Sequence, residues 1–280
     1  KVLEATVAER TRELQEQHEE LDEAHQIVVG SLNYASSLQK GQLPREHRLQ
    51  GRFESFEAIW EPRDTIGGDL WWMSTTRNEG PFALAIADCT GHGVPGAILS
   101  LLVSNSLERI YANNAGQDPR SALVSLDYLV RTGLNQDSPD SESDDGCDAA
   151  IVRIDREFKK LEYAGAKIDL FHIQTSGDIK RYEPARVSLG YQEQLKEEPE
   201  NQVINYESGD GFIMVTDGFT DQIGGTGAPR AYGYRRLHEL LKSVSTKSAS
   251  EIAEAMKTDL KNWQGDQKRR DDVSAVVFRL

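Results

Sequence analysis

Positive charge is scarce in this sequence relative to negative charge. Its 280 residues include 32 Lys and Arg against 46 Asp and Glu, which leaves a formal net charge of −14. This balance argues against a nucleic acid as the main partner, because proteins hold a phosphate backbone chiefly with Lys and Arg. A small anionic substrate such as a phosphate ester would also be repelled unless bound cations reversed the field at its site.

Cysteine and long apolar runs are also scarce. The two cysteines, Cys89 and Cys147, suit a reducing compartment better than a disulfide scaffold, so we expect a cytoplasmic protein. No apolar run approaches the roughly 18 residues that cross a membrane, and no signal peptide is visible. The sequence begins at Lys1 inside a helical pattern, so we expect a piece of a longer protein. Membrane association would then come only from an upstream region, as in the cytoplasmic output domain of a membrane-anchored sensor.

Residues 1–44 are predicted to form a helical linker that precedes a separate domain. The segment is rich in Glu, Gln, Ala and Leu, and Gly41 and Pro44 mark its end. One heptad row is apolar: Val7, Leu14, Leu21, Val28 and Ala35. The partner row is more polar, which is typical of a marginal coiled coil, and we favour a parallel homodimer that transmits a signal. The alternative is a single amphipathic helix that lies on the next domain.

Residues 45–280 are predicted to form one domain of strands and helices. Short strand-like runs recur with turn signals between them. Helical patterns cover about residues 97–111, 120–131, 234–244 and 249–263. We predict an α+β fold with a central antiparallel β-sandwich flanked by helices, preceded by the long N-terminal coiled-coil helix. An acidic, serine-rich loop at residues 135–148 is expected to be solvated and mobile.

Four aspartates indicate a site for divalent cations: Asp69, Asp88, Asp217 and Asp271. The first three lie near glycine at the boundary of an apolar segment, and Asp271 precedes the last apolar strand. Short carboxylates held rigidly at strand ends can bind Mg²⁺ or Mn²⁺, which prefer oxygen donors. Two such ions about 3.5–4 Å apart could activate a shared water for attack on phosphorus, so no protein nucleophile is needed. A lone Asp-Gly more often marks a turn, so the argument depends on all four.

Five short motifs follow one another between about residues 52 and 280. They are Ile66-Gly67-Gly68-Asp69, Asp88-Cys89-Thr90-Gly91-His92-Gly93-Val94-Pro95, Thr216-Asp217-Gly218, Tyr232-Gly233-Tyr234-Arg235-Arg236-Leu237 and Asp271-Asp272-Val273-Ser274. In order and spacing they resemble the SpoIIE/RsbU branch of the PPM-type serine/threonine phosphatases. The resemblance implies a β-sandwich flanked by helical pairs and a centre of two Mg²⁺ or Mn²⁺ ions. It also implies a phosphoserine substrate on a small STAS-like protein of the anti-sigma-antagonist type.

The resemblance also assigns roles to residues of this chain. Asp88 is expected to bridge both ions, and the backbone carbonyl of Cys89 is expected to be a further ligand. Asp69, Asp217 and Asp271 are expected to complete the set, with Asp271 preferred over Asp272 from the alignment of the Asp-Asp pair.

Several residues depart from the family pattern or invite another role. The family often has Ala-Gly-His after its middle strands, where this chain reads Ala164-Gly165-Ala166-Lys167. Lys167 is expected at the surface although it could meet the substrate phosphate. Asp148 could bind a third, weaker ion. His92 is expected to be structural, packed or capping, rather than a general acid, and Arg63 is expected at the surface although it could bind phosphate. Cys89 is not a nucleophile candidate, because no phosphate-binding loop ending in Arg follows it.

Two other functions remain open from the sequence. Gly67-Gly68-Asp69-Leu70 superficially resembles the signature of diguanylate cyclases, but it lacks the metal-binding Glu after Asp69 and leaves Asp217 and Asp271 without a role. A signalling scaffold that keeps the fold without catalysis is the non-enzymatic alternative. Regulation through the N-terminal helix is expected in either case, because the heptad region leads directly into the first strand.

Overall fold

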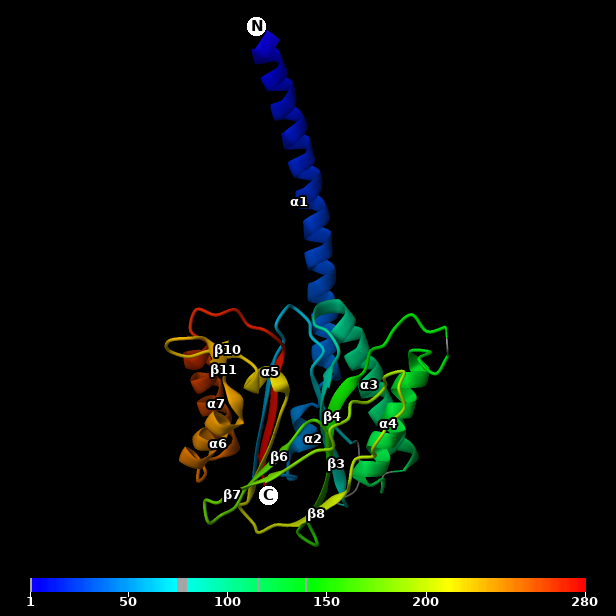
Figure 1. Cartoon of the computed structure of the whole chain (residues 1–280), viewed down its shortest axis with the longest axis vertical. Helices are drawn as coiled ribbons and strands as arrows, with labels where there is room; N and C mark the ends of the chain where they lie inside the picture. Colours follow the sequence, from blue (N-terminus) through cyan, green and yellow to red (C-terminus); the bar gives the residue numbers. More distant parts are fainter. Residues whose placement is uncertain (1, 75–79, 115, 139) are drawn as a thin grey trace. The chain divides into compact units, whose positions relative to one another are not determined.

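The chain is described here by a computed structural model that covers residues 2–74, 80–114, 116–138 and 140–280. It divides into two compact units, Lys1–Gly41 and Gln42–Leu280. Almost all of the first unit is helix α1, which runs from Val2 to Gln42 (Figure 1). No helix among the described residues combines the length and the apolar character needed to cross a membrane.

Helix α1 exposes its apolar heptad row. The side chains of Val7, Leu14, Leu21 and Val28 are each more than half exposed in the single chain, at 57%, 68%, 65% and 55%. Most of the stability of a helix in a protein comes from packing an apolar face, so an unpartnered row of this kind favours association. The expected long helix is therefore present, and its pairing as a coiled coil stays a prediction.

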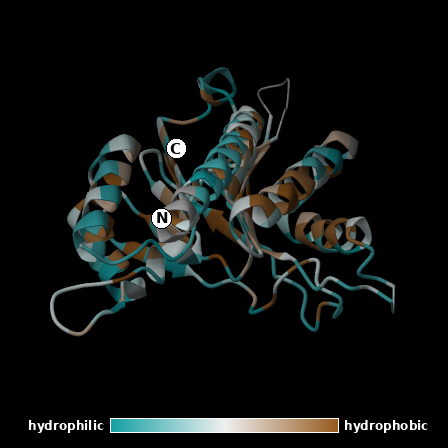
Figure 2. Ribbon diagram, turned by 90° about the horizontal axis from the view of Figure 1, so that it is seen from above, coloured by the Kyte–Doolittle hydropathy of each residue, from teal (hydrophilic) through white to brown (hydrophobic). Residues whose placement is uncertain are grey.

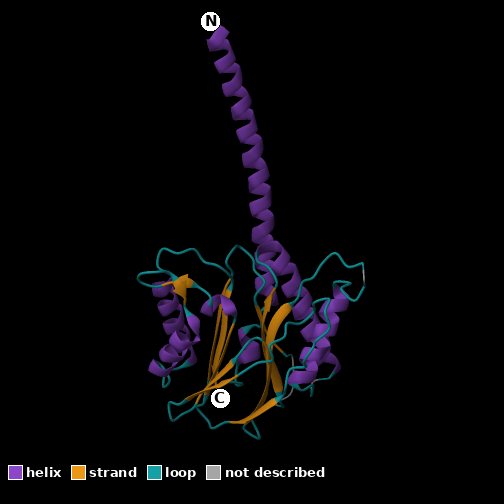
Figure 3. Cartoon of the chain, in the orientation of Figure 1, coloured by secondary structure: helices purple, strands orange, loops and turns teal. Residues whose placement is uncertain are grey.

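Two five-stranded sheets form the centre of the second unit (Figure 3). In spatial order the first consists of β1 (Ser55–Glu61), β12 (Val273–Arg279), β9 (Gly211–Val215), β6 (Leu170–Ile173) and β7 (Ile179–Tyr182). The second consists of β2 (Leu70–Met73), β3 (Phe82–Cys89), β4 (Cys147–Asp155), β5 (Lys160–Ala166) and β8 (Gln202–Asn205). Every neighbouring pair in both sheets is antiparallel.

One apolar cluster takes side chains from both sheets. Met73 and Leu84 of the second sheet share it with Met214 and Phe278 of the first, and all four are fully buried. Burial on both faces explains why β3, β9 and β12 read as continuous apolar runs rather than as alternating patterns. The common cluster holds the ends of strands from both sheets in fixed positions.

Helix pairs cover the two sheets (Figure 1). The second sheet contacts α3 (Gly93–Asn113) and α4 (Pro119–Gly133), and Figure 2 shows apolar residues, in brown, along this pair. The first sheet contacts α7 (Ala249–Gln264), against which α6 (Gly233–Ser243) packs. The remaining elements are α2 (Glu46–Leu49), α5 (Asp217–Thr220), β10 (Ile223–Gly224) and β11 (Arg230–Ala231).

Local signals explain where these helices begin. Asp118 caps α4, because its side chain accepts a hydrogen bond from the Ser121 amide at 3.0 Å. Helix α7 begins with a capping box in which Ser248 and Glu251 satisfy each other's backbone amides.

The two antiparallel sheets and the helices that cover them confirm the predicted α+β class.

The acidic loop at residues 135–148 is more tightly held than expected. Gln136 donates to the carbonyl of Asp145 at 2.7 Å, and the Gln192 amide donates to Asp144 at 3.0 Å. These bonds fix the described part of the loop against the segment around residue 190. The acidic side chains are mostly exposed, as expected, while the backbone is anchored.

Candidate metal centre

Asp69 immediately precedes β2, and its buried carboxylate is held by the hydroxyl of Thr216. Its side chain is 2% exposed, and the hydroxyl of Thr216 donates to Oδ2 at 2.8 Å. The indole of Trp60 donates to the Asp69 carbonyl at 2.9 Å. The other carboxylate oxygen, Oδ1, is buried and has no hydrogen-bond partner among the residues that the structure describes. A buried unpaired acceptor is costly, so it marks a position where a cation would be stabilising.

Asp88 lies near the end of β3, where it pairs with Asp148 of β4. Burial raises its pKa well above the usual range, the charges of Asp69 and Asp217 raise it further, and a hydrogen bond with Asp217 adds to the effect. Asp271 also contributes to the shift. The four aspartates singled out in the sequence therefore lie close enough for each to oppose the ionisation of Asp88.

Asp217 opens helix α5 and reaches solvent on one side. Partial burial raises its pKa, while the hydrogen bond from Asp88 lowers it. A Cβ added at Gly218 would lie 3.2 Å from the Cβ of Asp271 and would overlap the Asp272 carbonyl. The start of α5 is therefore pressed against the turn that precedes β12.

The neighbouring pair Asp271 and Asp272 divides into two different environments. Asp272 is 3% exposed, and its two carboxylate oxygens accept the backbone amides of Arg63 at 2.6 Å and Gly68 at 2.5 Å. It therefore holds the segment that carries Asp69. Asp271 is half-buried and accepts one bond, from the Asp272 amide at 2.9 Å. The carboxylate of Asp271 can therefore still accept a further contact, which suits a metal ligand. The carboxylate of Asp272 is already occupied by two backbone amides of the protein.

Gly68 allows the backbone of this segment to approach the end of β3. A Cβ at residue 68 would lie 2.6 Å from the carbonyl oxygen of Cys89 and 2.7 Å from that of Gly91. Only glycine tolerates such contacts. The expected metal-ligand carbonyl of Cys89 thus lies beside Asp69. Burial raises the pKa of the Cys89 thiol, which keeps it protonated and fits the expectation that it is no nucleophile.

His92 is not packed or capping, so that expectation is wrong. Its side chain is about half exposed, makes no capping bond to α3, and pairs through Nδ1 with Asp64 at 2.7 Å. Arg63 is at the surface, where its guanidinium donates to the carbonyl of Arg270 at 3.1 Å. Lys167 is exposed and lies 3.6 Å from Asp148.

Three positioning residues could not be recognised from the sequence. The Thr216 hydroxyl orients Asp69, Trp60 holds the Asp69 backbone, and Asp272 anchors Gly68. Thr216 and Asp272 belong to the motifs, which was the available signal, but the motifs do not show that they act as positioning residues. From the sequence, Trp60 is expected only to pack in the core, because its hydrogen bond to the Asp69 carbonyl depends on the tertiary fold.

The site offers carboxylate oxygens in a largely buried environment, but these oxygens are not arranged as a complete set of metal ligands. Among the described residues, no three Asp, Glu, His or Cys side chains already stand in a metal-binding arrangement. The unpaired Oδ1 of Asp69 and the mutual repulsion of the carboxylates nevertheless fit hard divalent cations, which would remove both costs. The role of the four aspartates as ligands stays a prediction.

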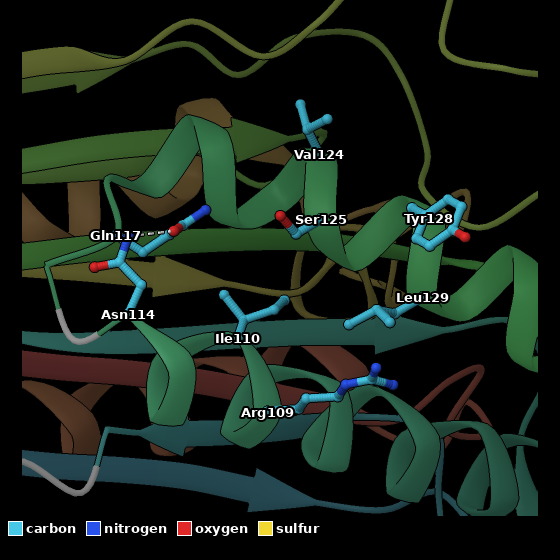
Figure 4. A pocket seen from close by; sticks show the side chains of 8 residues that line it. All are labelled: Arg109, Ile110, Asn114, Gln117, Val124, Ser125, Tyr128 and Leu129. Carbon is cyan, nitrogen blue, oxygen red and sulfur yellow. Dashed lines mark hydrogen bonds between the residues drawn. The ribbon is translucent and has the colours of Figure 1, made fainter.

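A second hollow lies between α3 and α4 and has a different character. It has a volume of about 440 Å³, and Figure 4 shows Arg109 and Ile110 facing Ser125, Tyr128 and Leu129 across it. Arg109 is the one charged side chain among the described residues that line it. It supplies no carboxylate, so it is not a candidate for metal-dependent chemistry.

Comparison with known families agrees with this geometry. The family model of SpoIIE, described as stage II sporulation protein E, matches residues 78–280, which is well over half of the chain. This chain belongs to the SpoIIE family. It is accordingly a SpoIIE/RsbU-like member of the PPM-type protein serine/threonine phosphatases. Among curated proteins, none is similar enough to count as a match.

Solved structures of SpoIIE-like proteins share the fold. The SiaA-PP2C domain of Pseudomonas aeruginosa is 29% identical, with a TM-score of 0.81 over 92% of this chain and 98% of that one. The RsbU and RsbW domains of a Mycobacterium tuberculosis protein are 16% identical, with a TM-score of 0.61 over 80% of this chain and 59% of that one. RsbX in complex with magnesium is 19% identical, with a TM-score of 0.52 over 80% and 93%.

The family assignment removes one of the alternatives from the sequence. The matched SpoIIE region contains Asp88, Asp217 and Asp271, and the phosphatase fold gives each a place at one site. A diguanylate cyclase would leave Asp217 and Asp271 without a role. The likeness of Gly67-Gly68-Asp69 to a cyclase signature is therefore superficial.

Proposed function

We propose that this SpoIIE-family chain hydrolyses phosphoserine on a small STAS-like signalling protein, with two Mg²⁺ or Mn²⁺ ions at the aspartate cluster. The observation that supports this best is the convergence of Asp69, Asp217 and Asp271 on Asp88, whose pKa each of them raises. Such crowding of carboxylates is unfavourable in a protein without cations and becomes favourable once cations bind. The magnesium complex of the structural neighbour RsbX is consistent with this choice of ion.

Each residue has a distinct part in the proposed site. Asp88 would contact both ions, with Asp69, Asp217, Asp271 and the carbonyl of Cys89 around them. When bound, the ions would supply an activated water and neutralise the charge of the phosphoryl group. The protein holds Asp69 in place through Thr216 and holds Gly68 through Asp272. This preorganisation limits the movement needed when phosphate binds.

A third ion at Asp148 has less support. Ser188 donates a hydrogen bond to one oxygen of this carboxylate, and Lys167 lies near the other. Burial raises the pKa of Asp148, while Ser188 and Lys167 lower it. A cation at this position would have to displace Lys167, so we assign Asp148 a mainly electrostatic role beside Asp88.

We further propose that the protein acts as a homodimer through α1 and resides in the cytoplasm, with residues 1–44 as a signalling linker and residues 45–280 as the phosphatase domain. The exposed heptad row supports the dimer, and the two free, buried cysteines suit a reducing compartment. The cluster to which both sheets contribute supports the β-sandwich implied by the family resemblance.

The test is phosphate release from phosphoserine proteins and peptides with Mn²⁺ or Mg²⁺, with GTP turnover measured in parallel. Asp88→Asn is expected to lower the rate of phosphate release at least about 100-fold, because it removes the charge that would contact both ions. The variant is expected to remain folded. Asp266→Asn, an exposed surface change, is the matched control. Full activity of Asp88→Asn would reject the metal mechanism. Absence of any activity in the wild type would favour the scaffold alternative.

A further inference from the structure

A basic pocket lies next to the aspartate cluster of this otherwise acidic chain. Its volume is about 460 Å³, and its lining includes Lys167, Arg186, Ser188, Tyr191 and Lys196. Three of its charged lining residues are cationic and one, Glu193, is acidic. In a chain with a net charge of −14, a hollow with this balance is a local reversal of the surface charge.

Three contacts connect this pocket to the proposed metal centre. Lys167 and Ser188 both reach Asp148, which pairs with Asp88 in the β3–β4 register. Directly opposed side chains in an antiparallel pair lie about 5 Å apart at Cβ, so the pocket wall begins two side chains from Asp88. The hydroxyls of Tyr191 and Thr90 also lie 2.7 Å apart, which joins the pocket to the motif that contains Asp88.

The wall that carries Arg186 is a fixed part of the fold. Backbone bonds at 2.9 Å join Ala185 to Gly165 and Lys167 to Ala185. Leu189 and Cys147 exchange two more at 2.8 and 2.9 Å. These bonds attach both ends of residues 185–189 to the edges of β4 and β5. A ligand would therefore meet a preformed surface rather than having to order a loop.

Among the described residues, Arg186 is the pocket cation for which the structure shows no partner. Lys196 pairs with Glu193 at 2.8 Å, and Lys167 lies 3.6 Å from Asp148. Arg186 is exposed and makes no hydrogen bond or ion pair with any residue that the structure describes. An unpaired guanidinium in a preformed pocket is well suited to bind a carboxylate through two parallel hydrogen bonds.

We propose that this pocket recognises an acidic side chain, Asp or Glu, that flanks the phosphoserine of the protein substrate, with Arg186 as the main contact. This inference rests on the proposed phosphatase function and adds a specificity determinant to it. Recognition of a flanking carboxylate would hold the phosphoserine at the aspartate cluster, which otherwise repels anionic substrates until cations bind. Arg186 is a specificity residue and takes no part in the chemical step.

The experiment compares a panel of phosphoserine peptides that carry a single Glu at each position from four before to four after the phosphoserine. The reference peptide has Gln at all of these positions. With Mn²⁺, at least one Glu position is expected to raise kcat/KM about tenfold through KM. Arg186→Glu is expected to remove this preference and to leave kcat unchanged. Lys at the same peptide position is expected to restore kcat/KM with Arg186→Glu.

Two controls show whether the preference arises at Arg186 itself. Arg235→Glu reverses another exposed arginine, on α6, and is expected to behave like the wild type. p-Nitrophenyl phosphate, which cannot reach the pocket, is expected to react within twofold of the wild-type rate with Arg186→Glu. Equal kcat/KM for all wild-type peptides would overturn this inference alone. Failure of the wild type to hydrolyse either the peptides or p-nitrophenyl phosphate would overturn the proposed function, and this inference with it.

Discussion

The hydroxyl of Thr216 donates a hydrogen bond of 2.8 Å to the carboxylate of Asp69, from 147 residues further along the chain. The same oxygen accepts the backbone amide of Ser274 at 3.0 Å. One small side chain therefore ties together three segments: the start of β2, the end of β9 and the beginning of β12. Because Asp69 is buried, its orientation depends on this bond.

Removing the Thr216 hydroxyl is expected to weaken both metal binding and folding. Thr216→Val keeps the volume but leaves the Ser274 amide and an oxygen of Asp69 without their partner, which costs about 1–3 kcal/mol. The Mn²⁺ concentration for half-maximal phosphate release is expected to rise about tenfold. Thr216→Ser, which retains the hydroxyl, is the control. Equal metal dependence for Val and Ser variants would show that Asp69 does not need this donor.

The pair Asp271 and Asp272 is expected to separate into a ligand and an anchor. Asp271→Asn is expected to lower phosphate release at least 100-fold while the melting temperature changes little. Asp272→Asn is expected to lower the melting temperature by several degrees, because its amide nitrogen replaces one of the two oxygens and cannot accept the bond that Arg63 or Gly68 now donates there. Calorimetry and Mn²⁺-dependent phosphate release distinguish the two. The reverse pattern would make Asp272 the ligand.

The metal-free protein is expected to lose stability as the pH rises. Burial and the charge of Asp272 raise the pKa of Asp69 to about 8, from a usual value near 4. The folded protein then retains a proton that the unfolded chain loses. The free energy of unfolding therefore falls between about pH 4 and pH 8. Urea denaturation in chelator should show this slope.

Asp69→Asn is the variant that tests the origin of the slope. It is expected to be more stable than the wild type at pH 8 in chelator and to show a shallower pH dependence. Mn²⁺ should stabilise the wild type but not this variant. Asp266→Asn, at the surface, serves as the control. A slope that is unchanged in Asp69→Asn would assign the effect to another group.

Gly68→Ala is expected to disrupt the site. The added Cβ would lie within 2.7 Å of two backbone oxygens, those of Cys89 and Gly91, and backbone cannot move aside as a flexible side chain can. Overpacking of this kind costs about 1–3 kcal/mol, and it would separate Asp69 from the end of β3. Gly80→Ala, where a Cβ meets no described residue within 4 Å, is the matched control. Melting curves and phosphate release with Mn²⁺ would test both.

The exposed heptad row of α1 is expected to pair two chains. Leu14→Lys together with Leu21→Lys places charge in the seam and is expected to weaken dimerisation at least tenfold by sedimentation. Glu20→Lys with Glu23→Lys adds the same number of lysines off the seam. If α1 regulates the phosphatase, the seam variant should also change turnover, as should deletion of residues 1–40. Unchanged turnover would make the helix a tether.

Much of the candidate site could be predicted from the sequence, because the motifs place their aspartates beside glycine and at strand boundaries. Asp69 and Asp88 fall where β2 begins and β3 ends, as expected. The helix and strand segments were also predictable, since the β3 run and the α4 pattern have clear periodicities. The anchoring of the acidic loop was missed, because Gln136 and Gln192 carry no signal of the backbone groups they contact.

The sequence alone determined the family, the fold class and the four aspartates, because motif order and apolar periodicity are properties of the chain itself. Only the tertiary structure decided that Thr216 orients Asp69, that Asp272 binds backbone, and that Lys167 meets Asp148. These pairings depend on which strand ends meet when two sheets pack together. The position of Arg186 in one pocket with Lys167 and Ser188, which reach Asp148, follows from the same packing.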